Sequence, residues 1–137
     1  MTSKVIYTGD LRTVAIHLRS GSEIQTDAPV DNHGKGERFS PTDLVATSLA
    51  SCLLTTLAIS AKTHNLNIEG AECQVEKIMI ASPRMIGEIK LDISFPNSPA
   101  FTDKEKKIIE HVANTCPVHM SLHPDLKKTY TFNWPTE

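Results

Sequence analysis

The sequence predicts an α+β domain in which antiparallel strands surround one long central helix. Three observations support this fold class. Short segments with alternating apolar residues occupy the first third of the chain and recur after residue 68. Residues 44–61 form a run without any charged side chain, and residues 102–114 carry a separate apolar stripe at helical spacing. The resulting order of elements, βββ-α-ββ-α-β, is typical of an α+β domain.

In the first third of the chain, strands are expected at residues 4–8, 13–19 and 22–26. Val14, Ile16 and Leu18 alternate with more polar residues, as in a strand with one buried face. Ser20-Gly21 is a turn signal, so the second and third segments are expected to form a hairpin. Residues 28–39 contain Pro, Asn and two glycines, and we expect them to form a surface loop.

The central helix is expected to begin at Ser40 and to end near Asn65. Ser40 can cap the helix, Pro41 suits its first turn, and Asp43 completes a variant of the capping box. A helix of about 22 to 25 residues is roughly 35 Å long. Because it is apolar nearly all round, one small sheet cannot cover it. We therefore expect a homodimer in which each subunit covers the central helix of the other.

The uncharged run at residues 44–61 also reaches the length of a membrane span. Six of its residues are hydroxylated, which is unusual for a helix that faces lipid: Thr47, Ser48, Ser51, Thr55, Thr56 and Ser60. We interpret the run as a helix buried in protein and not as a membrane anchor.

The second half of the chain repeats the mixture of strands and helix. Strands are expected at residues 68–81 and 85–95, joined by a turn, and a closing strand contains Tyr130, Phe132 and Trp134. Thr102 and Glu105 form a capping box, which predicts a helix that ends before Pro117. The chain has no internal repeat and no linker, so residues 1–137 are expected to form a single domain.

The composition excludes several classes of function. The chain has 137 residues, a net charge of −2 and 5% aromatic residues. A binding site for nucleic acid is therefore not expected, because it needs basic residues and aromatic side chains on which bases can stack. The first residues lack the apolar core of a signal peptide. The three cysteines form no C-x-x-C pair and are too few for a secreted disulfide framework. We expect a cytoplasmic protein that binds neither nucleic acid nor membrane.

Cys52 and Cys116 are the candidates for redox chemistry. Cys52 lies in the middle of the central helix, and Cys116 follows Val112 by one turn on the apolar side of the next helix. Pro117 can begin a further helical turn with Cys116 as its N-cap, where exposed amides and the helix dipole stabilise a thiolate. If the two apolar faces pack together, the sulfurs come within disulfide reach. The alternative is a pair of buried structural cysteines, the role that we also expect for Cys73.

Two stretches of the sequence resemble the OsmC/Ohr family of small peroxide-reducing proteins. The first is Ser40–Cys52, SPTDLVATSLASC, which is similar to the central-helix signature of the family. The second is Cys116–Leu122, CPVHMSL, which is similar to its second cysteine motif. The separation of the motifs, the strand order and the length also agree, so the resemblance covers essentially the whole chain.

The resemblance implies both a fold and a reaction. It implies an OsmC-like fold that forms an intertwined homodimer, with a site near the subunit interface and no cofactor. Cys52 would be the thiolate that attacks the O–O bond and becomes a sulfenic acid. Cys116 would resolve this acid as an intramolecular disulfide, which an external thiol or dithiol would reduce. The apolar surroundings favour an organic hydroperoxide, with hydrogen peroxide as a further candidate oxidant.

The resemblance also implies helper residues. In peroxidases of this family an arginine activates the thiolate, and an acidic residue orients that arginine. Arg38, in the loop before the central helix, is the first candidate for the arginine and Arg12 is the second, with a solvated surface charge as the alternative for each. The family's acidic residue falls near the helix start, where this chain has Thr42 and then Asp43. Asp43 is the candidate, with helix capping as the alternative, and Glu37 is another candidate partner for Arg38.

Other functions remain open from the sequence alone. His119 and His123 follow Cys116 in a C-x-x-H-x-x-x-H pattern, which with Cys52 resembles a zinc ligand set. Prolines constrain this stretch and no acidic residue is evident to orient the histidines, so we expect no metal. The alternatives to a peroxidase are a dimer of the same fold that binds a small apolar ligand, and a structural dimer with a metal or redox-sensing site at the two cysteines.

Overall fold

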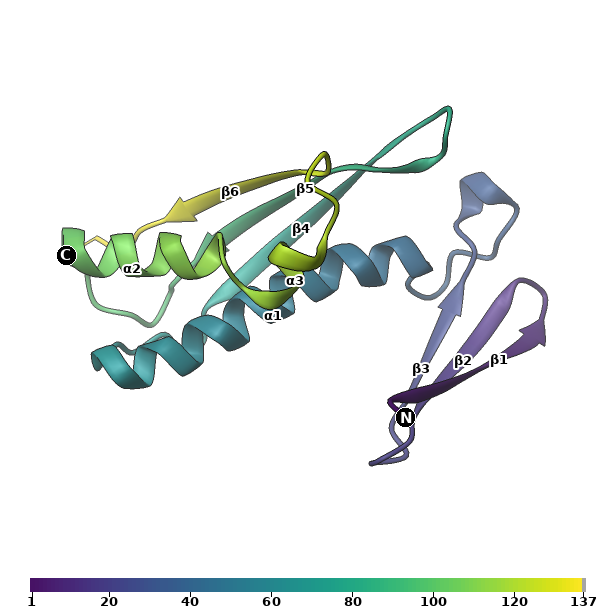
Figure 1. Ribbon diagram of the computed structural model, residues 1–137, viewed down its shortest axis with the longest axis horizontal. Coiled ribbons are helices and arrows are strands. Elements are labelled where there is room, and N and C mark those ends of the chain that lie inside the picture. The colour runs from purple at the N-terminus through teal and green to yellow at the C-terminus, as the bar shows by residue number, and fades with distance from the viewer. Residues whose placement is uncertain (137) are drawn as a thin grey trace. The chain divides into compact units, whose positions relative to one another are not determined.

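A computed structural model of the chain describes residues 1–136. The chain forms two compact units, Met1–Val45 and Ala46–Glu137. That these units make up a single domain stays a prediction. The first unit carries a three-stranded antiparallel sheet of order β1-β2-β3 (Figure 1). Its strands are β1 (Ser3–Gly9), β2 (Arg12–His17) and β3 (Glu23–Asp27). These strands confirm the hairpin arrangement predicted for this third of the chain.

The central helix, α1 (Pro41–His64), begins and ends where the sequence predicts. Its N-terminus is a capping box, because the Asp43 amide donates to the Ser40 hydroxyl and the Ser40 amide donates to the Asp43 carboxylate, each at 3.0 Å. The buried residues of α1 recur at three- and four-residue spacing: Ala46, Leu49, Ala50, Leu53, Leu57 and Ala61. The exposed face is also uncharged along most of its length: Ser48, Ser51, Thr55, Ala58 and Ile59.

By length and composition, α1 passes the test for a membrane-spanning helix. The same test is passed by core helices of soluble proteins, and 33% of its most apolar window is buried within the chain. The interpretation of α1 as a helix covered by protein therefore stays a prediction.

The second unit is built on a sheet of order β4-β5-β6 (Figure 1). Its strands are β4 (Glu72–Ile80), β5 (Met85–Ser94) and β6 (Lys127–Asn133). β4 and β5 pair in antiparallel fashion, whereas β6 runs parallel to β5. The expectation of purely antiparallel pairing is therefore wrong for the last strand. The reason is the long connection that contains α2 (Asp103–Ala113) and α3 (Pro117–Ser121), because a helical crossover returns the chain to the same end of the sheet.

The two outer strands also differ from the sequence prediction in their bounds. β4 begins at Glu72 and not at residue 68, and β6 ends at Asn133, so it contains the expected Tyr130 and Phe132 but not Trp134. α2 follows the prediction more closely, since Thr102 and Glu105 form the expected capping box.

One face of the second sheet carries the hydrophobic core. Its centre is formed by residues of β5 that are at most 1% exposed: Ile89, Leu91 and Ile93. They belong to one cluster with Leu53 of α1 and Ile109 of α2. Cross-strand neighbours share a face of a sheet, so the register places Cys73 of β4 and Tyr130 of β6 on this same inner face. The inner face thus brings a cysteine and a tyrosine to the helices.

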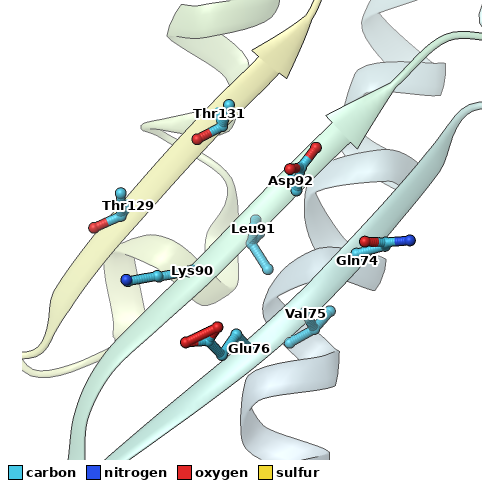
Figure 2. Close-up of a pocket in the computed structure, with 8 residues that line it drawn as sticks. All are labelled: Gln74, Val75, Glu76, Lys90, Leu91, Asp92, Thr129 and Thr131. Carbon is cyan, nitrogen blue, oxygen red and sulfur yellow. The ribbon is translucent and has the colours of Figure 1, made fainter.

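The opposite face of this sheet is polar and carries an open hollow of about 440 Å³. Glu76 lies across from Lys90, and Gln74 lies across from Asp92. Figure 2 shows the polar side chains of this face in front of the sheet, with the helices behind it. The predicted alternation in β5, with one wet face, is confirmed.

Candidate active site

Cys52 is half-buried in the middle of α1. The backbone amide of Val118 donates a hydrogen bond to its Sγ atom at 3.4 Å. The hydroxyl of Thr56, one turn further along the helix, lies 3.8 Å from the same sulfur. Val118 belongs to the first turn of α3, where backbone amides have no partner within the helix. Donors of this kind stabilise a thiolate.

Cys116 is fully buried, with 0% of its surface exposed. It is the N-cap of α3 and has an extended backbone, and Pro117 occupies the first turn, as the sequence predicts. Its thiol lies close enough to the side chain of Cys52 for the two groups to influence each other's ionisation. Burial raises the pKa of Cys116, and the contact with Cys52 raises it further against the opposing effect of nearby amides. Of this pair, Cys116 is the thiol that burial keeps protonated.

The structure thus brings together two cysteines that lie on different helices. Both are free thiols. The contact exists because α3 places its N-terminus over the middle of α1, with Val118 and Leu122 packed against the core cluster. The proximity that the sequence suggested is present, and the catalytic roles of the two residues stay predictions.

Cys73 has a different environment. It is half-buried in β4, and its thiol donates to the carbonyl oxygen of the neighbouring Gln74 at 3.8 Å. Burial, with a smaller contribution from the charge of Asp92, raises the pKa of Cys73 to about 11. A thiol with this pKa is almost entirely protonated near pH 7, in agreement with the structural role expected for it.

His119 and Tyr130 form a hydrogen-bonded pair beside the cysteines. His119 Nδ1 and the Tyr130 hydroxyl are 2.5 Å apart, and the ring centroids are 5.7 Å apart. Burial lowers the pKa of His119, and the charge of Lys128 lowers it further, so the imidazole is neutral near pH 7. Burial is the main cause that raises the pKa of Tyr130 above its usual value. The sequence does not predict this pair, because its pattern identifies Tyr130 only as a strand residue.

The histidines do not form the ligand set considered from the C-x-x-H-x-x-x-H pattern. His119 turns its Nδ1 atom to Tyr130, and the ring of His123 accepts a hydrogen bond from the Asp125 amide at 3.0 Å. Among residues 1–136, no group of three or more His, Cys, Asp and Glu side chains is placed to hold a metal ion.

The first unit contains a partly buried ion pair between Arg12 and Asp27. The Arg12 Nε atom and one terminal nitrogen donate to the two carboxylate oxygens of Asp27 at 2.7 and 2.9 Å. The Asp27 side chain is 0% exposed and also accepts the Glu37 amide at 3.2 Å. The Arg12 guanidinium holds the pKa of Asp27 below its usual range. This two-pronged contact fixes one orientation of the Arg12 guanidinium.

The sequence does not single out Asp27 as a functional residue. Its partner, Arg12, is indicated by the sequence only as one of two candidate arginines. The signal lies in the register of the hairpin, which places Arg12 directly opposite Asp27. That register follows from the turn that joins β2 and β3, and it cannot be predicted from any single residue.

Arg38 and Asp43 have more ordinary surroundings. Arg38 is exposed, and its guanidinium donates to the Gln25 side chain and to the Glu37 carbonyl oxygen, each at 3.2 Å. The Glu37 carboxylate lies 3.4 Å from the Arg12 guanidinium. The Asp43 carboxylate accepts the Ser40 amide in the capping box. Arg38 and Asp43 both belong to the first unit, and their catalytic roles stay predictions.

Replacing Asp27 with asparagine is expected to destabilise the protein in a pH-dependent way. Because the pKa of Asp27 is lowered in the folded state, its ionised form adds stability above the unfolded-state pKa of about 4, and this contribution is lost as the pH falls through the lower folded-state value. The difference in melting temperature between wild type and Asp27→Asn should therefore be large at pH 7 and shrink steadily below about pH 4.

Thermal denaturation from pH 2 to pH 8 measures this difference. Glu23→Gln is the matched control, because it neutralises an exposed carboxylate in the same strand. A pH-independent difference for Asp27→Asn, or equal stability at pH 7, would contradict the assignment of a stabilising ion pair.

Comparisons with known proteins support a family assignment. The family described as OsmC-like protein matches residues 34–130. A structure from Psychrobacter arcticus 273-4, provisionally named an osmotic stress induced and detoxification response protein, is 52% identical with a TM-score of 0.93, and the match covers 97% of this chain and 96% of that one. No curated protein matches the chain.

Two more distant structures share the fold. An organic hydroperoxide resistance protein OsmC from Legionella pneumophila has a TM-score of 0.74 at 15% identity, over 96% of both chains. A Vibrio cholerae protein, provisionally named an organic hydroperoxide resistance protein and solved with captopril in one of its active sites, has a TM-score of 0.71 at 14% identity, over 97% of this chain and 92% of that one. At these identities the likeness is one of fold alone. With a family match over most of its length, this chain belongs to the OsmC-like protein family.

Proposed function

We propose that this protein is a thiol-dependent peroxidase that reduces organic hydroperoxides through a Cys52 thiolate and a disulfide between Cys52 and Cys116. Membership of the OsmC-like family fits a redox function. The observation that carries the proposal is the pair of sulfurs itself: a half-buried thiol on α1 accepts a hydrogen bond from the Val118 amide of α3, and a fully buried thiol at the N-cap of the same short helix lies beside it.

The different surroundings of the two cysteines support different roles. Cys52 is partly exposed, which gives a peroxide access to its sulfur, and the Val118 amide can stabilise negative charge there. Cys116 is enclosed, and burial raises the pKa of its thiol. Cys52 is therefore the attacking thiolate in this proposal, and Cys116 is the thiol that resolves the oxidised product.

The reaction proceeds in three balanced steps. First, the Cys52 thiolate attacks one peroxide oxygen, the O–O bond breaks, and the alkoxide that leaves takes up a proton to become an alcohol, which leaves Cys52 as a sulfenic acid. Next, Cys116 attacks the Cys52 sulfur, the S–O bond breaks, and water departs with the Cys116 proton. Finally, an external thiol or dithiol reduces the disulfide by exchange and is itself oxidised.

In this proposal Arg12, and not Arg38, is the arginine that assists Cys52, because its guanidinium is held in one orientation. The contact with buried Asp27 fixes its guanidinium, whereas Arg38 is exposed and bonded to neutral groups. In this proposal Asp27, from β3, takes the orienting role for which Asp43 was the candidate. Asp43 would then act as a helix cap. Replacing Arg12 would lower the rate of Cys52 oxidation and leave disulfide closure unchanged.

The same proposal includes the oligomeric state of the protein, its partners and its cellular compartment. The exposed face of α1 is uncharged from Ser48 to Ile59, which supports a homodimer in which a second copy covers this helix. The partners are a small hydroperoxide and a thiol or dithiol reductant, in the cytoplasm, without nucleic acid, membrane or cofactor.

Thiol loss on peroxide addition tests this function. Reduced protein mixed with a slight excess of cumene hydroperoxide is expected to lose two of its three thiols promptly, and about 2 Da of mass per chain. With a small dithiol present it should consume cumene hydroperoxide catalytically, and hydrogen peroxide more slowly. Protein alkylated beforehand is the control. Persistence of all three thiols would contradict the proposal and favour a ligand-binding member of the family.

A further inference from the structure

α3 contacts both thiols of the proposed site. Cys116 is its N-cap, and the Val118 amide in its first turn bonds to Cys52. A helix of only five residues makes few internal hydrogen bonds and is not stable alone. Within the described chain, no residue of α3 is fully buried. Its position therefore depends on a small number of contacts with the rest of its unit.

His119 makes a polar contact of this kind. Its Nδ1 atom bonds to the Tyr130 hydroxyl on β6. Tyr130 lies beside Leu91 of β5, which is 1% exposed, so the hydroxyl is carried by a strand that is fixed against the core. Because both partners are partly buried, loss of either one leaves a polar group without its hydrogen bond. The contact connects the short helix to the most buried region of the sheet.

We propose that His119 and Tyr130 are positioning residues whose hydrogen bond holds α3 so that the Cys116 thiol stays directed at Cys52 while the sulfenic acid is resolved. This inference rests on the proposed peroxidase function. The step concerned forms the S–S bond, breaks the S–O bond of the sulfenic acid, and releases water with the Cys116 proton. It requires the two sulfurs to be aligned, and a displacement of α3 of the order of 1 Å slows such a step strongly.

A displaced α3 has a distinct chemical signature. The sulfenic acid at Cys52 either closes to the disulfide or reacts with a second peroxide to give a sulfinic acid. Slower closure therefore increases the sulfinic product. The first oxidation needs no alignment with Cys116 and depends on α3 only through the Val118 amide, so it changes less. A general loss of folded protein would instead lower both rates together and leave the product ratio unchanged.

Rapid-quench mass spectrometry of the full-length protein separates these outcomes. Tyr130→Phe and His119→Ala are each expected to slow disulfide closure about tenfold or more, while the first oxidation changes by less than about threefold. His119→Asn should recover closure, since the asparagine amide lies where imidazole Nδ1 does. The double variant Tyr130→Phe with His119→Ala should be no slower than either single variant, because both remove one bond.

His111→Ala is the matched control, because His111 is an exposed histidine of α2, and it should close at the wild-type rate. Melting temperatures identify any variant that fails to fold. If Tyr130→Phe is such a variant, the rates of disulfide closure in His119→Asn and His119→Ala decide whether the hydrogen bond positions α3. If wild type closes its disulfide and Tyr130→Phe does so equally fast, or if His119→Asn is as slow as His119→Ala, the inference is overturned and the peroxidase stands. If wild type forms no disulfide at all, the proposed function itself fails and takes the inference with it.

Discussion

Cys52→Ser is expected to abolish peroxide reduction, with a fall of at least about 10³-fold in the rate. A serine hydroxyl is not ionised near neutral pH and is a far weaker nucleophile than a thiolate, so the attack on the O–O bond has no substitute. The effect is the largest expected from any single change, because Cys116 is fully buried and its thiol is kept protonated. Peroxide consumption at a fixed concentration of dithiol measures it.

Cys73→Ser is the matched control for this change. It removes a thiol of similar burial whose pKa is raised to about 11, and we expect the rate to stay within about twofold of wild type. If Cys52→Ser retained most of the activity, or if Cys73→Ser were the inactive variant, the assignment of the attacking sulfur would be wrong.

Cys116→Ser is expected to have the second largest effect, and a different one. The first oxidation of Cys52 should proceed, because its sulfur and the Val118 amide are still present. Resolution should fall about 10²-fold, since a thiol held beside the sulfenic acid is replaced by thiols that must diffuse to it. Steady-state turnover should therefore collapse, while a single equivalent of peroxide is still consumed.

The trapped intermediate distinguishes this variant from Cys52→Ser. A dimedone adduct should form on Cys52 in Cys116→Ser, and excess peroxide should convert the same residue to sulfinic acid. Wild type, treated in the same way, should give the disulfide and little adduct. Full turnover of Cys116→Ser without a trappable sulfenic acid would show that Cys116 does not resolve Cys52.

The elements that the sequence predicted well are those with local signals. The capping box of Ser40 and Asp43 fixed the start of α1, and Thr102 with Glu105 fixed the start of α2. Pro117 likewise indicates a new helical turn with Cys116 as its N-cap, as the structure has it. Each of these features is decided by residues within one turn of a helix, so a single sequence is enough to find them.

The features that the sequence did not predict depend on contacts between distant segments. The parallel direction of β6 results from the whole connection between β5 and β6, and alternation in a strand is the same in either direction. The ion pair of Arg12 with Asp27 depends on hairpin register, which one residue of slippage would abolish. The contact of His119 with Tyr130 requires both α3 and β6 to be in place.

The candidate site shows the same division. Cys52 and Cys116 were found from motif and helical spacing, and the structure places them in contact. Arg38 was preferred over Arg12 because of its position in the loop before α1, yet the buried carboxylate of Asp27 holds Arg12. Burial and charge pairing decide which arginine is held rigidly, and neither can be read from position along the chain.

Peptide mapping without reduction, after one equivalent of cumene hydroperoxide, tests the pairing of the two sulfurs most directly. The expected result is one intramolecular crosslink that joins the peptide containing Cys52 to the peptide containing Cys116, formed within the time of peroxide loss and reversed by a dithiol. A crosslink that involves Cys73, a crosslink between chains, or unlinked peptides with Cys52 unmodified would contradict the two-thiol cycle.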